Sequence, residues 1–376
     1  MAKLDYSTTI AIDAEHSVFH FYSMMGNDKS KIAHYKKSYG GEPFSEEFFA
    51  KFKKAVAEFA QNTPSDTVRK VTVVLPDSAV LTDTVKVPTL KGNGQTQKAL
   101  DVTFAGIYRN YQDLQVVANI IDQNKQYSTF AVTAVQKSIV SAIYAACSEN
   151  KLLVDTLTYE SCAAVGGAIT LNPRMRSDSY LFLDIKDVYS HFAFVVNGYA
   201  VGYYKLPFGL EFLKSNKVAE ERSLFDHSYA ELVVINSHEK ARSQNITVES
   251  DDEEIEEADD SSKSLFKKSS RSKNTTRDAD AIDEEIAYEN FRVFIKWALL
   301  LLESNDNLTA LGKPEYVCVN IPAELESVIE KANDQTDPNG IAFTRLPIDV
   351  EDVPLSKHLE LYGGLFPRQI SPTGKL

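Results

Sequence analysis

The chain has 376 residues, of which 43% are hydrophobic and 25% are charged, so it can bury a sizeable core in roughly two to four compact lobes. Its formal net charge of −13 excludes a broad nucleic-acid surface, because such a surface needs clustered Lys and Arg. We therefore expect a globular protein with no nucleic-acid partner.

The cysteines and the apolar runs indicate the cellular compartment of the protein. Cys147, Cys162 and Cys318 have no C-x-x-C spacing and lie among apolar neighbours, which predicts buried free thiols in a reducing compartment. The N-terminal segment MAKLDYSTTIAI contains no long apolar stretch, and the run 297–302 is only about a third of a membrane span. The sequence therefore predicts a cytoplasmic location without direct membrane insertion, so that any membrane contact comes through a partner.

Strand and helix patterns alternate along the chain, which predicts an α/β architecture. The expected strands cover 8–12, 18–23, 70–75, 80–87, 129–135 and 153–158, followed by a hairpin within 180–208. The expected helices cover 45–61, 95–110, 136–149, 162–170, 283–303 and 323–332. Ser45 is the expected N-cap of the first helix.

Two segments share a strand, an aspartate, a tight turn and a second strand. The aspartates are Asp13 and Asp184, about 170 residues apart, which predicts an internal duplication. In nucleotide-binding hairpins of this shape, a glycine sits two residues after the aspartate so that backbone N–H groups reach the phosphates. Glu15 and Lys186 occupy these two positions, which indicates a damaged phosphate site in each half.

The seven histidines predict no metal site. His16 and His20 are four residues apart, a spacing that aligns two ligands on a helix, but they fall in a strand–turn–strand segment. We therefore expect ordinary packing or surface positions for both.

Between the two hairpins, Glu160 begins a segment of small residues, ESCAAVGG. An acid followed by small residues at the start of a helix suits close packing beside a cleft, with the carboxylate holding a metal-bound water. A helix whose small face merely packs tightly explains the same pattern, and both interpretations stay open at this point.

One stretch has the composition of a flexible insertion. Residues 249–260 are almost wholly acidic and 261–277 are basic and serine-rich, so they cannot bury enough apolar surface to offset the entropy of ordering. We expect a disordered charged insertion at about 243–281. It is either a plain solvated loop or a regulatory segment with phosphoserines or a docking site for a basic partner.

In this order, the motifs resemble those of the actin-like ATPase superfamily. The first hairpin is similar to its phosphate-1 motif, YESCAAVGG to its first connecting motif, LFLDIKDVYSHFAFVVNG to its phosphate-2 motif, and HLELYGGLFPRQ to its second connecting helix. Within the superfamily, VTVVLPDSAVLTDTVKVPTL and KLPFGLEFL resemble segments of the type IV pilus assembly family PilM and of its cell-division relative FtsA.

This resemblance implies a duplicated actin-like (ribonuclease H-like) α/β fold with an inserted small α+β subdomain. It places the first half of lobe 1 at 1–76, the inserted subdomain at 77–152, the return to lobe 1 at 153–179, and lobe 2 at 180–376. Small residues at Gly363–Gly364 then allow the two halves to pack closely, and a plain C-terminal stop of the helix explains them equally well.

The resemblance also implies a nucleotide cleft between the halves. If the cleft is retained, its nucleotide contacts come from Asp13, Asp184, Ser190, Lys186 and Gly209. Asp13 and Asp184 would organise the magnesium ion, and Glu160 is the candidate catalytic acid.

Three departures from the family pattern bear on this cleft. Two are Glu15 and Lys186, and the third is Pro322–Ala323, where the family has a glycine pair. They predict lost hydrolysis and lost tight binding, because phosphoryl transfer depends on positioning the phosphates. We therefore expect no cofactor, and Mg-ATP only if the cleft is functional.

By the same resemblance, the protein is a PilM-like pseudo-ATPase scaffold that binds the cytoplasmic segment of an inner-membrane protein in a pilus or cell-envelope assembly machine. In that family a short extended peptide docks in a groove beside the inserted subdomain. The closing residues SPTGKL form no amphipathic helix of the FtsA kind, which favours the PilM-like branch. An active Mg-ATP-dependent ATPase and self-association into actin-like filaments are the alternatives that the sequence leaves open.

Overall fold

The computed structural model describes residues 6–26, 32–62, 69–91, 94–108, 110–206, 208–214, 284–335, 340–346 and 358–376. The predicted insertion at 243–281 lies outside these residues. Within the described part of the chain, no helix combines the length and the apolar character that crossing a membrane requires.

The first half of the chain forms a five-stranded sheet in the order β3-β2-β1-β4-β8. Strand β2 pairs antiparallel with both β1 and β3, whereas β1 pairs with β4 and β4 with β8 in parallel. The strand bounds are β1 Tyr6–Asp13, β2 Val18–Met25, β3 Ile32–Ser38, β4 Arg69–Leu75 and β8 Leu152–Tyr159.

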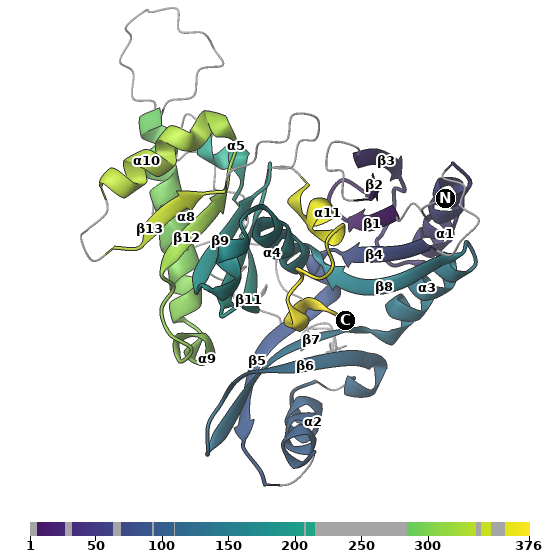
Figure 1. Ribbon diagram of the computed structural model, residues 1–376, viewed down its shortest axis with the longest axis horizontal. Helices are drawn as coiled ribbons and strands as arrows, with labels where there is room; N and C mark the ends of the chain where they lie inside the picture. The colour runs from purple at the N-terminus through teal and green to yellow at the C-terminus, as the bar shows by residue number, and fades with distance from the viewer. Residues whose placement is uncertain are drawn as a thin grey trace, which may run out of the picture.

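Helices α1 (Glu46–Asn62) and α3 (Lys137–Ser148) pack beside this sheet (Figure 1). The apolar residues of α1 recur at helical spacing and are buried, from Phe48 to Phe59. The hydroxyl oxygen of Ser45 accepts the Phe48 N–H at 3.2 Å, so Ser45 caps this helix as the sequence predicted.

The second half repeats the first. Its sheet has the order β11-β10-β9-β12-β13, with antiparallel pairing among β9, β10 and β11 and parallel pairing of β9 with β12 and of β12 with β13. The bounds are β9 Tyr180–Ile185, β10 Ser190–Val196, β11 Tyr199–Leu206, β12 Tyr316–Asn320 and β13 Ala342–Arg345. Two sheets with the same order and directions confirm the predicted duplicated α/β fold.

Among the described residues, the helices of this second half include α5 Leu210–Leu213, α8 Glu284–Glu303, α9 Asp306–Thr309 and α10 Glu326–Asp334. The long helix α8 buries Phe291, Phe294 and Trp297 against the outer face of the sheet. Short 3₁₀ segments in the described part of the chain are Asp77–Ala79, Tyr111–Asp113, Pro173–Ser177, Ala323–Leu325 and Pro372–Gly374.

A three-stranded antiparallel sheet, in the order β5-β7-β6, is inserted between β4 and α3. Its strands are β5 Val80–Pro88, β6 Leu114–Gln123 and β7 Tyr127–Gln136, and helix α2 (Gln95–Ile107) packs on β5. This unit has its own small core around Phe104 and Phe130, and it lies at the bottom of Figure 1.

Helix α3 packs on α1 and β8, and its Ile139 and Ile143 belong to the core of lobe 1. We therefore propose that the inserted subdomain ends at Gln136 and that α3 returns to lobe 1. The other predicted domain boundaries stay predictions.

Two helices lie between the five-stranded sheets, α4 (Glu160–Leu171) and α11 (Leu359–Gly364) (Figure 1). They pack against each other through small residues. A Cβ added to Gly363 would overlap the backbone of Ala163 and Gly167, so this close approach requires glycine. The three cysteines are free and buried, as predicted.

Candidate functional site

Both halves line one cavity of about 290 Å³ between the sheets. Its walls come from the end of β1, the turn after β9, the start of α4 and the region around α11. Asp13, Glu160 and Lys186 all reach this cavity. The resemblance assigns these residues to a nucleotide cleft, and we call this cavity the cleft. Its volume lies just below the ~300–1,000 Å³ typical of small-molecule sites.

The first hairpin holds Asp13 with groups of its own turn. The backbone N–H groups of Glu15 and His16 donate to Asp13 Oδ1 at 3.0 and 2.9 Å. The ring nitrogens His16 Nδ1 and His20 Nε2 lie 2.8 and 3.5 Å from Asp13 Oδ2. Burial alone would raise the pKa of Asp13, but hydrogen bonds from His20 and His16 lower it to about 2. Asp13 is therefore ionised and already bonded.

Further imidazoles extend this network. His20 Nδ1 lies 3.0 Å from His34 Nε2, and the His20 and His358 ring centroids are 4.8 Å apart. Burial, together with the neighbouring histidines, lowers the pKa of His34 to about 4, so this ring is neutral at pH 7. The sequence predicted ordinary packing or surface roles for His16 and His20, whereas the structure places both against Asp13.

The second hairpin holds Asp184 differently. Its carboxylate is fully buried, accepts a hydrogen bond from Asn320 Nδ2 at 2.6 Å, and lies 3.1 Å from Lys186 Nζ. The same ammonium lies 2.6 Å from Glu360 Oε2 on α11. Burial alone would lower the pKa of Lys186, but Asp184 and Glu360 raise it. Lys186 is thus a buried cation between two carboxylates, one from each side of the cleft.

The other predicted nucleotide contacts stabilise the second hairpin itself. The Ser190 hydroxyl donates to the Phe208 carbonyl at 2.6 Å. The N–H groups of Leu210 and Glu211 donate to the carbonyls of Lys186 and Asp187 at 2.8 and 2.9 Å.

A Cβ on Gly209 would lie only 2.5 Å from Lys186 O and 2.6 Å from Asp187 O, which is too close for a carbon atom. The backbone can therefore approach these carbonyl groups only because residue 209 is glycine. In the first hairpin, Glu15 forms an ion pair with Lys205 of β11, across the cleft. Both residues that stand in place of the family's glycines therefore carry ion pairs.

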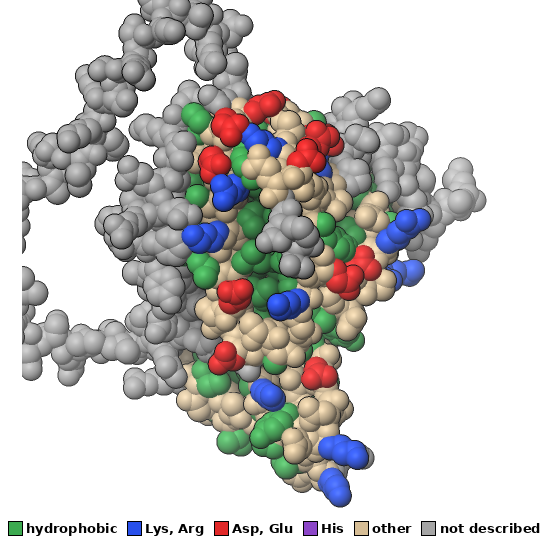
Figure 2. Space-filling model, turned by 90° about the vertical axis from the view of Figure 1, so that its left-hand side faces the viewer, with side chains coloured by type: hydrophobic (Ala, Val, Ile, Leu, Met, Phe, Trp, Pro, Cys, Tyr) green, Lys and Arg blue, Asp and Glu red, His purple; other side chains and the backbone are tan. Residues whose placement is uncertain are grey.

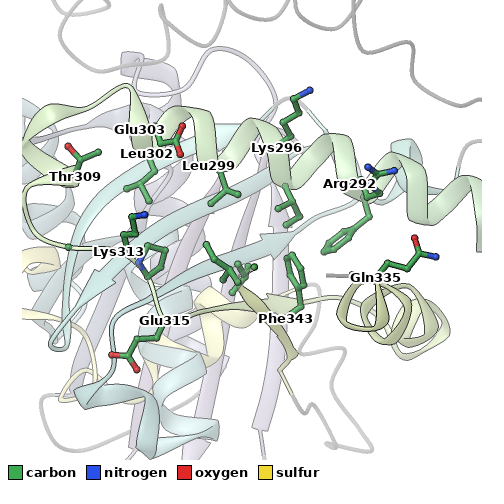
Figure 3. A pocket seen from close by; sticks show the side chains of 18 of the residues that line it. Arg292, Lys296, Leu299, Leu302, Glu303, Thr309, Lys313, Glu315, Gln335 and Phe343 are labelled. Carbon is green, nitrogen blue, oxygen red and sulfur yellow. The ribbon is translucent and has the colours of Figure 1, made fainter. Parts of the chain in front are cut away.

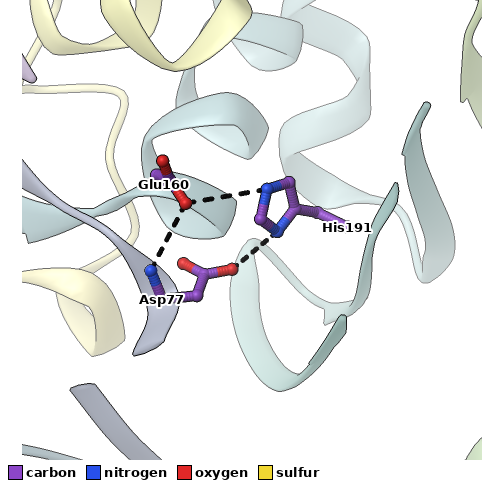
Figure 4. Close-up of side chains that lie close together, drawn as sticks. All are labelled: Asp77, Glu160 and His191. Carbon is purple, nitrogen blue, oxygen red and sulfur yellow. Dashed lines mark hydrogen bonds and ion pairs between the residues drawn. The ribbon is translucent and has the colours of Figure 1, made fainter. Parts of the chain in front are cut away.

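Glu160 belongs to a second cluster, with Asp77 and His191 (Figure 4). Asp77 follows β4, Glu160 begins α4, and His191 comes from β10 of the other half. His191 Nδ1 lies 2.7 Å from Asp77 Oδ2, and His191 Nε2 lies 3.7 Å from Glu160 Oε2. Burial raises the pKa of Glu160 to about 8.

Sequence reasoning found Glu160 but not Asp77, His191 or Glu360. A signal for His191 was present, since it is a lone titratable residue in the buried strand SHFAFVV. Asp77 stands directly after the strand and proline of VVLPD, at the carboxyl end of a parallel strand.

Larger cavities lined by described residues also lie away from the cleft. A groove of about 710 Å³ runs between residues 42–44, before α1, and the inserted subdomain, with Leu81, Tyr108 and Ile139 in its wall. We call it the subdomain groove.

The other cavity, of about 720 Å³, lies on the outer face of lobe 2 between α8, α10 and β13. Figure 2 shows hydrophobic side chains gathered in this hollow with charged side chains around it. In Figure 3, Leu299 and Phe343 point into it and Lys296 points away. We call it the outer cavity.

No protein-family model matches the chain, and no curated protein matches it. Among solved structures, a PilM–PilN type IV pilus biogenesis complex is similar with a TM-score of 0.54 and 12% identity, over 97% of this chain and 99% of that chain. The cytoplasmic domain of EpsL, an inner-membrane component of the type II secretion system of Vibrio cholerae, gives a TM-score of 0.37 and 11% identity over 54% of this chain and 71% of that chain. The Alp12 filament structure gives a TM-score of 0.37 and 12% identity, over 97% of this chain and 99% of that chain. The chain therefore has the duplicated actin-like fold and is similar in fold to PilM over nearly its whole length, as the order of its motifs predicted.

Proposed function

We propose that this protein is a PilM-like scaffold that binds the cytoplasmic segment of an inner-membrane protein in a pilus or cell-envelope assembly machine. The observation that carries the proposal is the subdomain groove, which lies beside the inserted three-stranded sheet. The fold similarity to the PilM–PilN complex, in which a PilM-like chain has a partner, supports it.

The lining of the subdomain groove suits a short extended peptide. Phe44, Leu81, Tyr108 and Ile139 offer apolar surface, and charged groups such as Glu42, Asp113 and Lys137 line it as well. A volume of about 710 Å³ can hold several side chains. Extended peptides gain affinity from backbone hydrogen bonds and specificity from such side-chain pockets.

We also propose that the protein is a pseudo-ATPase that does not hydrolyse ATP, and the contacts in the cleft support this. The buried ammonium of Lys186 already has two carboxylate partners, Asp184 and Glu360. To bind a triphosphate with Mg²⁺, Lys186 and Asp184 would have to leave their present ion pairs and contact the phosphates and the metal ion. Phosphoryl transfer depends on placing cations and hydrogen-bond donors around the phosphates in this way. These charged groups are therefore already paired with one another, which supports weak or no nucleotide binding.

The partner proposal is tested by retention of membrane proteins on the full-length chain. Leu81→Glu places a charge in the subdomain groove, and Leu299→Glu places the same charge at a partly buried position in the outer cavity as the matched control. Each immobilised chain is incubated with detergent-solubilised membranes of the cells that make it, and bound proteins are identified by mass spectrometry. A synthetic peptide of the cytoplasmic segment of any retained protein is then titrated calorimetrically.

We expect the unaltered chain and Leu299→Glu to retain the same integral membrane protein, and Leu81→Glu to lose it with at least a tenfold weaker peptide affinity. Retention of no integral membrane protein, or equal retention by Leu81→Glu, would overturn the proposal.

A further inference from the structure

We propose that His191 and Glu160 bind a first-row transition-metal cation of the zinc type, with Asp77 holding the imidazole in place (Figure 4). The site lies at the junction of the two halves, so a bound ion would join them. It is separate from the aspartates Asp13 and Asp184 that the actin-like resemblance assigns to magnesium.

The first argument is an orphan nitrogen. His191 is only 2% exposed, and its Nε2 has no hydrogen-bond partner among the residues that the structure describes. The nearest carboxylate oxygen in its cluster, Glu160 Oε2, is 3.7 Å away, which is too long for a good hydrogen bond. Buried polar atoms are normally satisfied, and a bound cation would satisfy this nitrogen.

The second argument is the distance itself. Zinc binds nitrogen at about 2.0–2.1 Å and carboxylate oxygen at about 2.0–2.2 Å, so two ligands of one ion can lie up to about 4.2 Å apart. The separation of 3.7 Å between His191 Nε2 and Glu160 Oε2 falls within that limit. A cation placed between these two atoms would satisfy both.

The third argument concerns the other ring nitrogen. His191 Nδ1 lies 2.7 Å from Asp77 Oδ2, an arrangement in which Nδ1–H donates to the carboxylate. In the neutral imidazole this leaves the Nε2 lone pair facing Glu160, and a bound cation would take the place of the proton that the neighbouring carboxylates otherwise favour on the ring. Carboxylates orient metal-binding histidines in this way, and the Asp77 carboxylate is itself fixed by the Ser161 N–H, 3.0 Å from Oδ1, and by the Ser161 hydroxyl.

Charge and access also favour a cation. Two carboxylates, Asp77 and Glu160, share one imidazole, and Asp184 pairs in register with His191 across the sheet. The positive charge of Lys205, on β11, partly offsets these negative charges, because it lowers the pKa of Glu160. Glu160 lines the interlobe cavity, which gives an ion a path from solvent and room for water ligands. A mixed nitrogen and oxygen donor set favours zinc, nickel or copper over magnesium and calcium.

The test uses the full-length chain after removal of metals with a chelator. Zinc binding is measured by equilibrium dialysis with elemental analysis, for the unaltered chain, His191→Gln, Glu160→Gln and the control His34→Gln. His34 belongs to the separate histidine group near Asp13, so its variant reports whether that group is the zinc site instead. Circular dichroism checks the fold of each variant.

We expect one equivalent of zinc on the unaltered chain and on His34→Gln, and at least a tenfold weaker affinity in Glu160→Gln and His191→Gln. Magnesium should bind at least a hundredfold more weakly than zinc. If His191→Gln does not fold, Glu160→Gln and the spectrum of the cobalt-substituted chain decide, because nitrogen and oxygen ligands give no thiolate-to-cobalt charge-transfer band. No zinc binding, equal binding by Glu160→Gln, loss in His34→Gln, or a thiolate band would each overturn the proposal.

Discussion

The two hairpins that face the cleft occupy equivalent places in the two halves, but they neutralise their aspartates differently. Asp13 has an 18% exposed side chain and is bonded by turn N–H groups and by two histidines. Asp184 is fully buried and is bonded by Asn320 and Lys186. A duplicated backbone position can therefore keep its acid while the partner changes from two imidazoles, the exposed His16 and the buried His20, to the ammonium of Lys186.

The comparison predicts its largest effect at Lys186. Lys186→Met removes the shared cation and leaves Asp184 and Glu360 buried without it, so the free energy of unfolding should fall by about 3–5 kcal/mol. Urea denaturation at pH 7 measures this change. The matched control is Glu15→Gln at the corresponding position of the first hairpin, where the pair with Lys205 is about one-third exposed and less than about 1 kcal/mol is expected. Equal losses in the two variants would show that the hairpins do not differ.

The second prediction concerns the helix that carries Glu360 to the cleft. Gly363→Ala forces a Cβ into the backbone of Ala163 on α4, so α11 must move and stability should fall by about 3 kcal/mol. Gly106→Ala in α2 is the control, because its Cβ would meet no atom within 4 Å. There the helix propensity of alanine should raise stability by about 0.5–1 kcal/mol. Two similar values would contradict the close packing of α4 on α11.

The third prediction concerns the stability of the folded chain at acid pH. The pKa of Asp13 is about 2 in the folded chain and 3.8 in its unperturbed form, so its stabilising contribution is complete above about pH 4 and is lost as the pH falls toward 2. The loss amounts to about 2 kcal/mol. Denaturation at a series of pH values should therefore show a shallower acid slope for Asp13→Asn than for the unaltered chain. Parallel acid slopes would mean that the histidines do not hold Asp13.

Much of the fold could be predicted from the sequence because its main strands are apolar and end at recognisable turns. Strand β3 could not, because its pattern IAHYKKS is mostly polar and exposed at a sheet edge. Strand β6 was missed because it is largely half-exposed, and β13 has only four residues. The helix predicted to reach residue 110 ends at Ile107, since Tyr108 is already extended.

The candidate site was predictable only where local motifs mark it. Asp13, Glu160, Asp184 and Lys186 stand in short recognisable segments, whereas Glu360 lies 174 residues from its partner Lys186. No local sequence pattern predicts that Lys186, just after β9, forms an ion pair with Glu360 on α11. The residue that replaces the family's glycine could be identified, but not the ion pairs that give it a role.

We propose that the charged groups of the cleft pair with one another and that the protein neither binds nor hydrolyses Mg-ATP. Isothermal titration of the full-length chain with Mg-ATP, together with a phosphate-release assay on the same sample, tests it most directly. We predict no binding heat and no phosphate release above the blank. Tight binding with turnover would show that Lys186 gives way to the nucleotide and would contradict the scaffold account.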